Sequence, residues 1–275
     1  MRQGRNPAAT VYESLGANFF LALDPGWLNL GLWEGPGTLE EAPRAVRRLV
    51  ETLAQDLPRD GVILDVGNGL GAQDPLIARI ARPRRLAALN ITESQLREGR
   101  SRLGEAGALP VVGDATRLPI RSGAIDGVIS VEAAFHFRSR RAFFEEVVRV
   151  LRPGGVLTMS DVSVERPPPG LLEGLAGFAQ LRLWGLRAKN LSSAERIADL
   201  ARRAGLVDVR MARCGDRVLD PALAAVALRL RDAGEVPPGQ RLAARFFLAQ
   251  VRTLRRREMI DYVLLRARRS TRQDA

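Results

Sequence analysis

Short apolar runs and amphipathic segments alternate through the middle of the chain, and this alternation predicts an α/β fold. Residues 40–57 read EEAPRAVRRLVETLAQDL, and their apolar positions recur at helical spacing: Val46, Leu49, Val50, Leu53 and Leu57. We therefore expect an amphipathic helix with one face on a core. Val62 to Val66 follow as a short apolar run that ends in a glycine cluster, which is typical of a buried parallel strand.

The same rhythm continues to residue 161. Four more apolar runs are read as strands: RLAALN (85–90), ALPVVGD (108–114), AIDGVISVE (124–132) and GGVLTMSD (154–161). Between them, ESQLREGRSRL (93–103) and RAFFEEVVRVL (141–151) have the pattern of helices. Strands that alternate with helices in this way predict a doubly wound, mostly parallel sheet.

The alternation breaks after Asp161. A segment that begins with three prolines, residues 166–190, is expected to be a helical cap inserted above the sheet. SSAERIADLARRAGL then restores a capped helix, and VDVRMARC and MIDYVLLRAR would supply two final strands. Those two strands bring the expected sheet to seven, with a helical segment at 220–256 between them.

The glycine-rich stretch DVGNGLGA, residues 65–72, satisfies two ligand-binding patterns. Gly67, Gly69 and Ala72 fit G-x-G-x-x-A, the dinucleotide pattern, which would bring phosphate anions to a helix N-terminus. Gly67, Gly69 and Gly71 after Asp65 fit D-x-G-x-G-x-G, and an acid at the strand end suits a cationic ligand. A tight turn without any ligand is the third interpretation.

Charge and cysteine content change this picture little. The formal net charge is +11, but Lys189 is the only lysine among the 42 basic residues, and the arginines are spread along helices. This distribution argues against a nucleic-acid partner, although the arginine-rich end of the chain could meet an anion. The sequence shows neither a run of roughly 18 to 20 apolar residues nor an apolar leader, so we expect no membrane insertion and a cytoplasmic protein. Cys214, the single cysteine, is expected to be a buried thiol without a role.

Four motifs in order, ILDVGNGLGA, ALNIT, GDATRLP and VVRVLRPGGVLTMSD, resemble the class I S-adenosylmethionine-dependent methyltransferases over residues 60–161. The resemblance implies a Rossmann-like sheet and S-adenosyl-L-methionine as cofactor, with S-adenosyl-L-homocysteine as product. The sequence shows no cluster of metal ligands, so we expect no metal. The residues that it implies near the cofactor are Asp65, Gly67, Gly69, Gly71, Asn90, Asp114, Ala115 and Glu132. Asp65 would organise the loop and Asp114 would accept from the adenine amino group.

Asn90 departs from the family pattern, because many members carry an acid there for the ribose hydroxyls. An amide can still bond both hydroxyls, without a charge-assisted acceptor. The alternative is that Asn90 is a turn residue at a strand end. Glu132 could face the cofactor or the substrate, and its role stays open at this stage.

VEAAFHF and MSD resemble the branch of the family that methylates hydroxyls of antibiotic sugars and polyketides. The resemblance implies His136 as general base, with Asp161 orienting it or sharing the task. Histidine titrates near neutral pH, with an unperturbed pKa of about 6.5, which suits this role. The plainer interpretation of His136, which stands between two phenylalanines, is a packed loop residue.

VYESL and LNLGLW match a tyrosine-bearing helix and an N-x-G-x-W segment that fold over the cofactor in that branch. By this resemblance residues 1–39 form a helical flap on the methyltransferase domain 40–275, with Tyr12 and Trp33 covering the sulfonium. Alternatively, Leu28, Leu30 and Trp33 pack the flap onto the sheet.

The expected activity is O-methylation of a small secondary metabolite by a monomer or homodimer, as in natural-product or antibiotic biosynthesis. A C-methyltransferase for an isoprenoid or lipid alkene is the main alternative. An RNA methyltransferase lacks support, because SVEAAF stands where an Asn-Pro-Pro-Tyr loop is expected. A cofactor-binding protein without activity is the remaining class.

Overall fold

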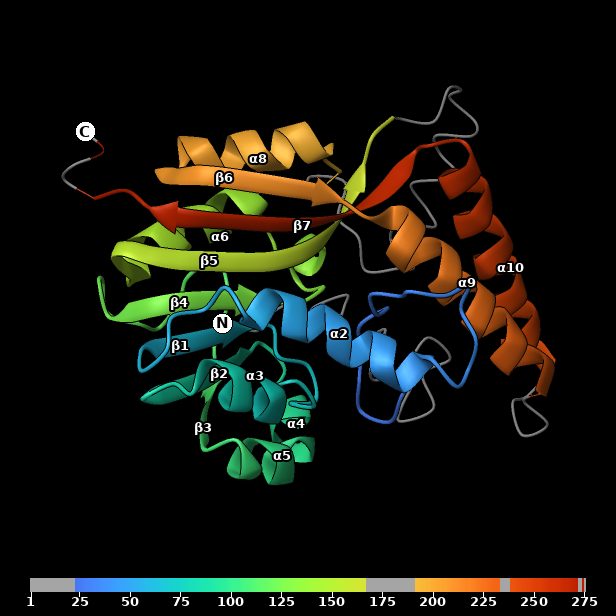
Figure 1. Cartoon of the computed structure of the whole chain (residues 1–275), viewed down its shortest axis with the longest axis horizontal. Helices are drawn as coiled ribbons and strands as arrows, with labels where there is room; N and C mark the ends of the chain where they lie inside the picture. Colours follow the sequence, from blue (N-terminus) through green and yellow to red (C-terminus); the bar gives the residue numbers. More distant parts are fainter. Residues whose placement is uncertain (1–22, 167–190, 233–237, 272–273, 275) are drawn as a thin grey trace, which may run out of the picture.

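The computed structural model describes residues 23–166, 191–232, 238–271 and 274. Its centre is a seven-stranded sheet in the order β3-β2-β1-β4-β5-β7-β6 (Figure 1). The strands are β1 (Val62–Val66), β2 (Arg85–Asn90), β3 (Ala108–Val112), β4 (Ile125–Ser130), β5 (Leu151–Val164), β6 (Leu206–Arg213) and β7 (Ile260–Arg269). Neighbouring strands from β3 to β5 pair in parallel, and β7 runs antiparallel to both of its neighbours, β5 and β6. The mostly parallel, doubly wound sheet is confirmed.

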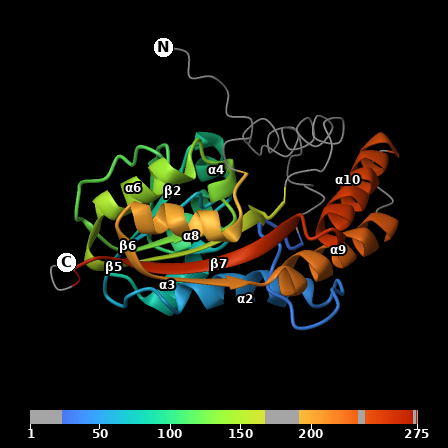
Figure 2. The same cartoon turned by 90° about the horizontal axis from the view of Figure 1, so that it is seen from above.

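Helices cover both faces of this sheet. They are α2 (Ala42–Ala54), α3 (Asp74–Ala81), α4 (Glu93–Glu98), α5 (Arg100–Glu105), α6 (Arg140–Val150), α8 (Ala194–Arg203), α9 (Gly215–Asp232) and α10 (Pro238–Arg256), with a 3-10 turn η2 (Ala134–His136). Viewed from above, α2 and α3 lie on one side of the sheet and α6 and α8 on the other (Figure 2). Because parallel strands are buried on both faces, this arrangement gives the protein two apolar cores.

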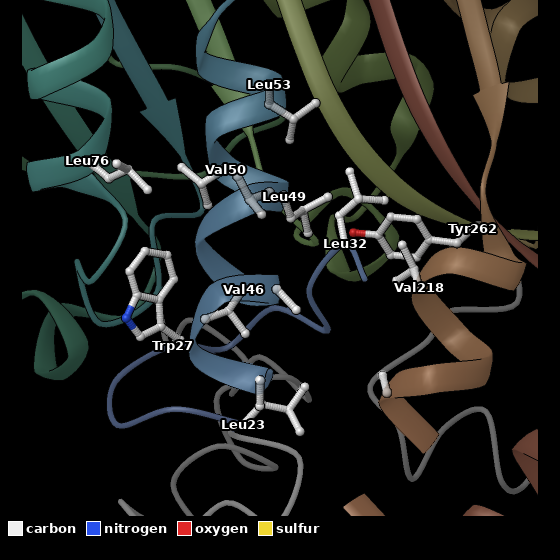
Figure 3. Packing of buried hydrophobic residues seen from close by; sticks show 14 of the residues in the cluster. Leu23, Trp27, Leu32, Val46, Leu49, Val50, Leu53, Leu76, Val218 and Tyr262 are labelled. Carbon is white, nitrogen blue, oxygen red and sulfur yellow. The ribbon is translucent and has the colours of Figure 1, made fainter. Parts of the chain in front are cut away.

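Helix α2 shows how the apolar pattern builds the first core. The side chains of Val46, Leu49, Val50 and Leu53 are buried along one face of the helix. Figure 3 shows that apolar side chains from several other elements surround this face, among them Trp27, Leu76, Val218 and Tyr262. The helical periodicity of residues 40–57 therefore identified a true core helix.

Two of the predicted elements have clearly different boundaries in the structure. The single helix expected at 93–103 is broken at Gly99 into α4 and α5, and a Cβ at Gly99 would lie 2.6 Å from the carbonyl oxygen of Leu70. Strand β5 was expected at 154–161, but it runs from Leu151 to Val164, and its last residues are in the strand because β7 pairs with β5 from Val156 to Val164. Asp161 consequently lies inside the strand.

The C-terminal part follows the predicted order. Strand β6 is followed by α9 and α10, and β7 then inserts between β5 and β6. Cys214 is a buried free thiol, as expected, and loss of hydration raises its pKa to about 12. The cap expected at 166–190 lies outside the described residues except for Arg166, and Tyr12 also lies outside them. The division into flap and methyltransferase domain stays a prediction.

Candidate functional site

The loop after β1 has a backbone shape that requires glycine. Gly67, Gly69 and Gly71 have φ angles of 82°, 58° and 73°, in the left-handed region that side chains disfavour. A Cβ on Gly67 would lie 2.4 Å from the Cβ of Ala133, and one on Gly69 would lie 3.0 Å from Leu28. Glycine at these three positions therefore keeps the loop backbone open at the carboxyl end of the sheet, where open α/β sheets bind ligands.

Polar side chains beneath this loop leave hydrogen-bond acceptors unused. Asp65 accepts from Nε2 of Gln73 at 2.6 Å, and Asn68 donates to Asp74 at 3.3 Å. Among the described residues the Oδ1 atoms of Asp65, Asn68 and Asp74 are buried without a hydrogen-bond partner. Unsatisfied buried acceptors are costly, so this cluster fits a ligand that brings N–H donors.

The two acids also hold their protons more tightly than usual. Burial, with the carboxyl of Asp74 nearby, raises the pKa of Asp65 well above its usual range. Burial likewise raises the pKa of Asp74 to about 7. Positive charge on a ligand would favour the ionised forms, so the pair suits a cation rather than a phosphate. Both the glycine loop (residues 67–71) and these acids thus fit S-adenosylmethionine, whose methionyl ammonium and sulfonium are cationic.

Asn90 is tied into the protein at the end of β2. Its Nδ2 donates to the carbonyl of Gly69 at 3.1 Å and to Oε1 of Gln95 at 3.0 Å. Its Oδ1 accepts from the backbone N–H of Thr92. These bonds match the turn-residue interpretation, and they also connect the glycine loop to β2. A bond to a ribose remains a prediction that uses the second lone pair of Oδ1.

Asp114 lies after β3 and is partly exposed. Its Oδ1 accepts from the backbone and the hydroxyl of Thr116, while its Oδ2 lies 3.3 Å from Nε of Arg138. The neighbouring Ala115 is buried. Since Arg138 follows β4, this ion pair joins the loop after β3 to the segment after β4. Contact of Asp114 and Ala115 with adenine stays a prediction.

Glu132 joins three segments at the end of β4. Its Oε1 accepts from the backbone N–H of Leu30 at 2.7 Å and from the hydroxyl of Tyr262 at 2.8 Å. Loss of hydration raises the pKa of Glu132 to about 7, although these two hydrogen bonds oppose the shift. Glu132 therefore holds the N-terminal segment and β7 beside the glycine loop, and its contact with cofactor stays a prediction.

His136 ends the 3-10 turn η2, which follows β4 at the carboxyl edge of the sheet. The side chain is partly buried, and its ring centroid lies 4.1 Å from that of Phe135 at an angle of 50°. Phe137 makes an edge contact with Phe143, with the two ring centroids 4.9 Å apart. His136 is thus on the expected edge and is only partly enclosed by its aromatic neighbours.

Asp161 forms an ion pair with Arg140, a partner that the sequence did not suggest. Its carboxylate accepts from Nε of Arg140 at 2.6 Å and from Nη2 at 3.0 Å, and both side chains are buried. Arg140 also donates to the carbonyl of Val162. Because Arg140 begins α6 four residues after His136, the pair fastens the start of that helix to β5. A direct role of Asp161 in catalysis stays a prediction.

The N-x-G-x-W segment makes a compact turn against α2 and α9. Asn29 Oδ1 accepts from the N–H of Gly31, and a Cβ on Gly31 would lie 2.9 Å from Ala45. The Trp33 side chain is 1% exposed; its indole donates to the carbonyl of Leu30, and its backbone N–H to Arg217. Trp33 thus packs in the core, the second of the two interpretations, whereas Leu28 touches the glycine loop. Contact of Trp33 with a cofactor remains only a prediction.

Sequence reasoning missed several partners of the site residues. Gln73 and Asp74 stand just after the glycine motif, and their polarity at the start of a helix was the available signal. Arg140 and Tyr262 gave no comparable signal, because each meets its partner only through the pairing of distant elements. In the described part of the chain no group of three or more His, Cys, Asp or Glu side chains is placed to hold a metal.

Comparison with known proteins identifies relatives of the chain. Residues 64–159 match the family model described as a methyltransferase domain. Erythromycin 3''-O-methyltransferase of Saccharopolyspora erythraea is 30% identical over 258 residues, which cover 89% of this chain and 81% of that protein.

Solved structures share the fold. The cyclopropane synthase MmaA2 from Mycobacterium tuberculosis superposes with a TM-score of 0.76 at 18% identity, covering 98% of this chain and 99% of that one. Geranyl diphosphate C-methyltransferase from Streptomyces coelicolor A3(2) has a TM-score of 0.67 at 17% identity, covering 96% and 99%. None of the described helices is both long and apolar enough to cross a membrane.

Proposed function

Because the chain belongs to the class I S-adenosylmethionine-dependent methyltransferases and methylates small molecules, we propose that its acceptor is a hydroxyl of a secondary metabolite, a sugar or polyketide. The observation that carries this proposal is His136, which lies on the same edge of the sheet as the glycine loop. The printed name of the erythromycin relative supports the acceptor class.

The residues divide the work as follows. The glycine loop, Asp65 and Asn90 would hold the cofactor, which supplies an electrophilic methyl group on a sulfonium. His136 would accept the hydroxyl proton while the acceptor oxygen forms its bond to the methyl carbon and the carbon–sulfur bond breaks. In-line geometry, with the oxygen about 3 Å from the methyl carbon and opposite sulfur, would supply much of the rate.

Asp161 would act through Arg140 as a positioning residue. Their buried, bidentate pair fastens the beginning of α6, and η2 with His136 lies immediately before it. A charged pair with this geometry fixes the orientation of the elements that it joins. Asp161 thereby contributes to the placement of His136 while its own carboxylate stays paired.

C-methylation is the second candidate, and Glu132 favours it. Its carboxyl, with a pKa raised to about 7, could remove a proton from a methylated carbon acceptor. The fold neighbour named geranyl diphosphate C-methyltransferase motivates the same test. This reaction would not need His136 to face a hydroxyl.

The test is transfer of a labelled methyl group to a panel of acceptors. The protein is incubated with methyl-labelled cofactor and, separately, with glycosylated polyketides, free polyketides, prenyl diphosphates, fatty acids and RNA. Our proposal expects label in a glycoside or polyketide as a new methoxy group. Label attached to carbon in a prenyl diphosphate would support the second candidate, and label in RNA alone would overturn both.

A further inference from the structure

The amino-terminal edge of the sheet carries a cavity that methyl transfer does not use. Its volume is about 520 Å³, and it is lined by Val62, Arg84, Arg85, Arg121, Ala124, Ile125 and Arg152. Val62, Arg85 and Ile125 are the first residues of β1, β2 and β4. The glycine loop follows the opposite end of β1, about 13 Å away along a strand of this length. The cavity is therefore separate from the cofactor site.

The walls of this cavity are strongly positive. Four of the lining residues are arginines, and none is acidic. Arg152 pairs with Asp126, whose Oδ1 accepts from Nη1 of Arg152 at 2.6 Å and whose Oδ2 accepts from the N–H of Val62 at 2.7 Å. Within the described residues, the other three arginines of the lining contribute three positive charges that no ion pair balances.

Three of these arginines, Arg84, Arg85 and Arg121, are exposed and form no ion pair with the described residues. Among the described residues the side chains of Arg84, Arg85 and Arg121 have neither a hydrogen-bond partner nor a carboxylate within 4.0 Å. Elsewhere on the surface arginines commonly meet acids, as Arg97 meets Glu93. Like charges held around one hollow repel each other, and an anion between them would relieve that repulsion.

We propose that this cavity binds a small molecule that carries a diphosphate group. Guanidinium groups bind phosphate oxygens in a bidentate manner. Two phosphate groups carry about three negative charges near neutral pH, which matches the net charge of the walls. Ligand pockets commonly enclose roughly 300 to 1,000 Å³, and the apolar side chains of Val62, Ala124 and Ile125 leave room for an organic group on the phosphate.

The experiment is calorimetric titration of the full-length protein with inorganic pyrophosphate and with adenosine diphosphate. The test variant is Arg84→Gln with Arg121→Gln, which removes two unpaired cations from the cavity. The matched control is Arg203→Gln with Arg245→Gln, which removes the same charge from exposed positions on α8 and α10. Circular dichroism verifies that both variants are folded.

We expect the wild type and the control variant to bind pyrophosphate with similar affinity, and the cavity variant to bind at least about tenfold more weakly. Saturation with S-adenosylhomocysteine should leave pyrophosphate binding unchanged. Absence of binding by the wild type, or equal weakening in both variants, would overturn the proposal. Displacement of pyrophosphate by S-adenosylhomocysteine would also overturn it, because the anion would then occupy the glycine loop.

Discussion

Asp65 and Asp74, two buried carboxyl groups, make the charge beneath the glycine loop depend on pH. Both have raised pKa values, with that of Asp74 at about 7, so the pair carries protons in weakly acid solution. A cationic ligand binds better once they ionise, and affinity must then rise with pH. We predict that S-adenosylmethionine binds about tenfold more tightly near pH 7 than near pH 5.5, as measured by calorimetry.

Two variants separate this effect from other titrations. Asp74→Asn should flatten the rise in affinity, because it removes one of the titrating groups. His136→Gln should retain it, although histidine titrates in the same range. Affinity that is independent of pH in the wild type, or an unchanged slope in Asp74→Asn, would contradict the assignment of these acids.

At the scale of single residues, the sequence predicts which residues belong to the site better than it predicts their hydrogen-bond and ion-pair partners. The glycines and Asp65 were identified because a bare, tight turn after a strand has a local signature. The pairing of Glu132 with Tyr262 spans 130 residues of chain and that of Arg140 with Asp161 spans 21. Such contacts depend on how strands and helices meet, which a local pattern does not encode.

At the scale of elements, the pair between Arg140 and Asp161 joins α6 to β5. Breaking a buried ion pair leaves one charge without compensation, at a cost of about 3 to 5 kcal/mol. We predict that Arg140→Leu lowers the free energy of unfolding by about this amount, as measured by urea denaturation. The control is Arg141→Leu, which breaks the exposed ion pair with Glu145 on the same helix. It should lower the free energy of unfolding by about 1 kcal/mol or less.

The double variant Arg140→Leu with Asp161→Leu should recover much of the stability, because no buried charge is left alone. Turnover gives a readout beyond stability: if Asp161 positions His136, the double variant should lose turnover even where it is folded. Full turnover in a folded double variant would remove Asp161 from the account.

The N-x-G-x-W segment is the second element whose role is testable. Trp33 is 1% exposed and packs in the first core, so its truncation leaves a cavity. We predict that Trp33→Ala lowers the free energy of unfolding by about 3 to 5 kcal/mol, while the affinity of the folded protein for S-adenosylmethionine changes little. Weakened cofactor binding without loss of stability would favour the flap interpretation instead.

At the scale of the whole molecule, hydrophobic patterning was sufficient for the architecture. Buried parallel strands produce continuous apolar runs, and the helices between them carry one apolar face. Both kinds of element could therefore be predicted from the sequence. The ends of the elements were harder to predict. Strand β5 extends past Asp161 because β7, about a hundred residues later in the chain, pairs with it there. The cavity lined by arginines was likewise invisible, since its residues come together only where four strands begin.

The central proposal for the whole molecule is that His136 takes the proton from an acceptor hydroxyl beside the bound cofactor. With the acceptor found in the labelled-methyl panel, the deciding measurement is turnover by His136→Ala at saturating cofactor, alongside its affinity for S-adenosylmethionine. The account predicts a loss of about 100-fold or more in kcat with cofactor affinity nearly unchanged. Turnover equal to that of the wild type would contradict it.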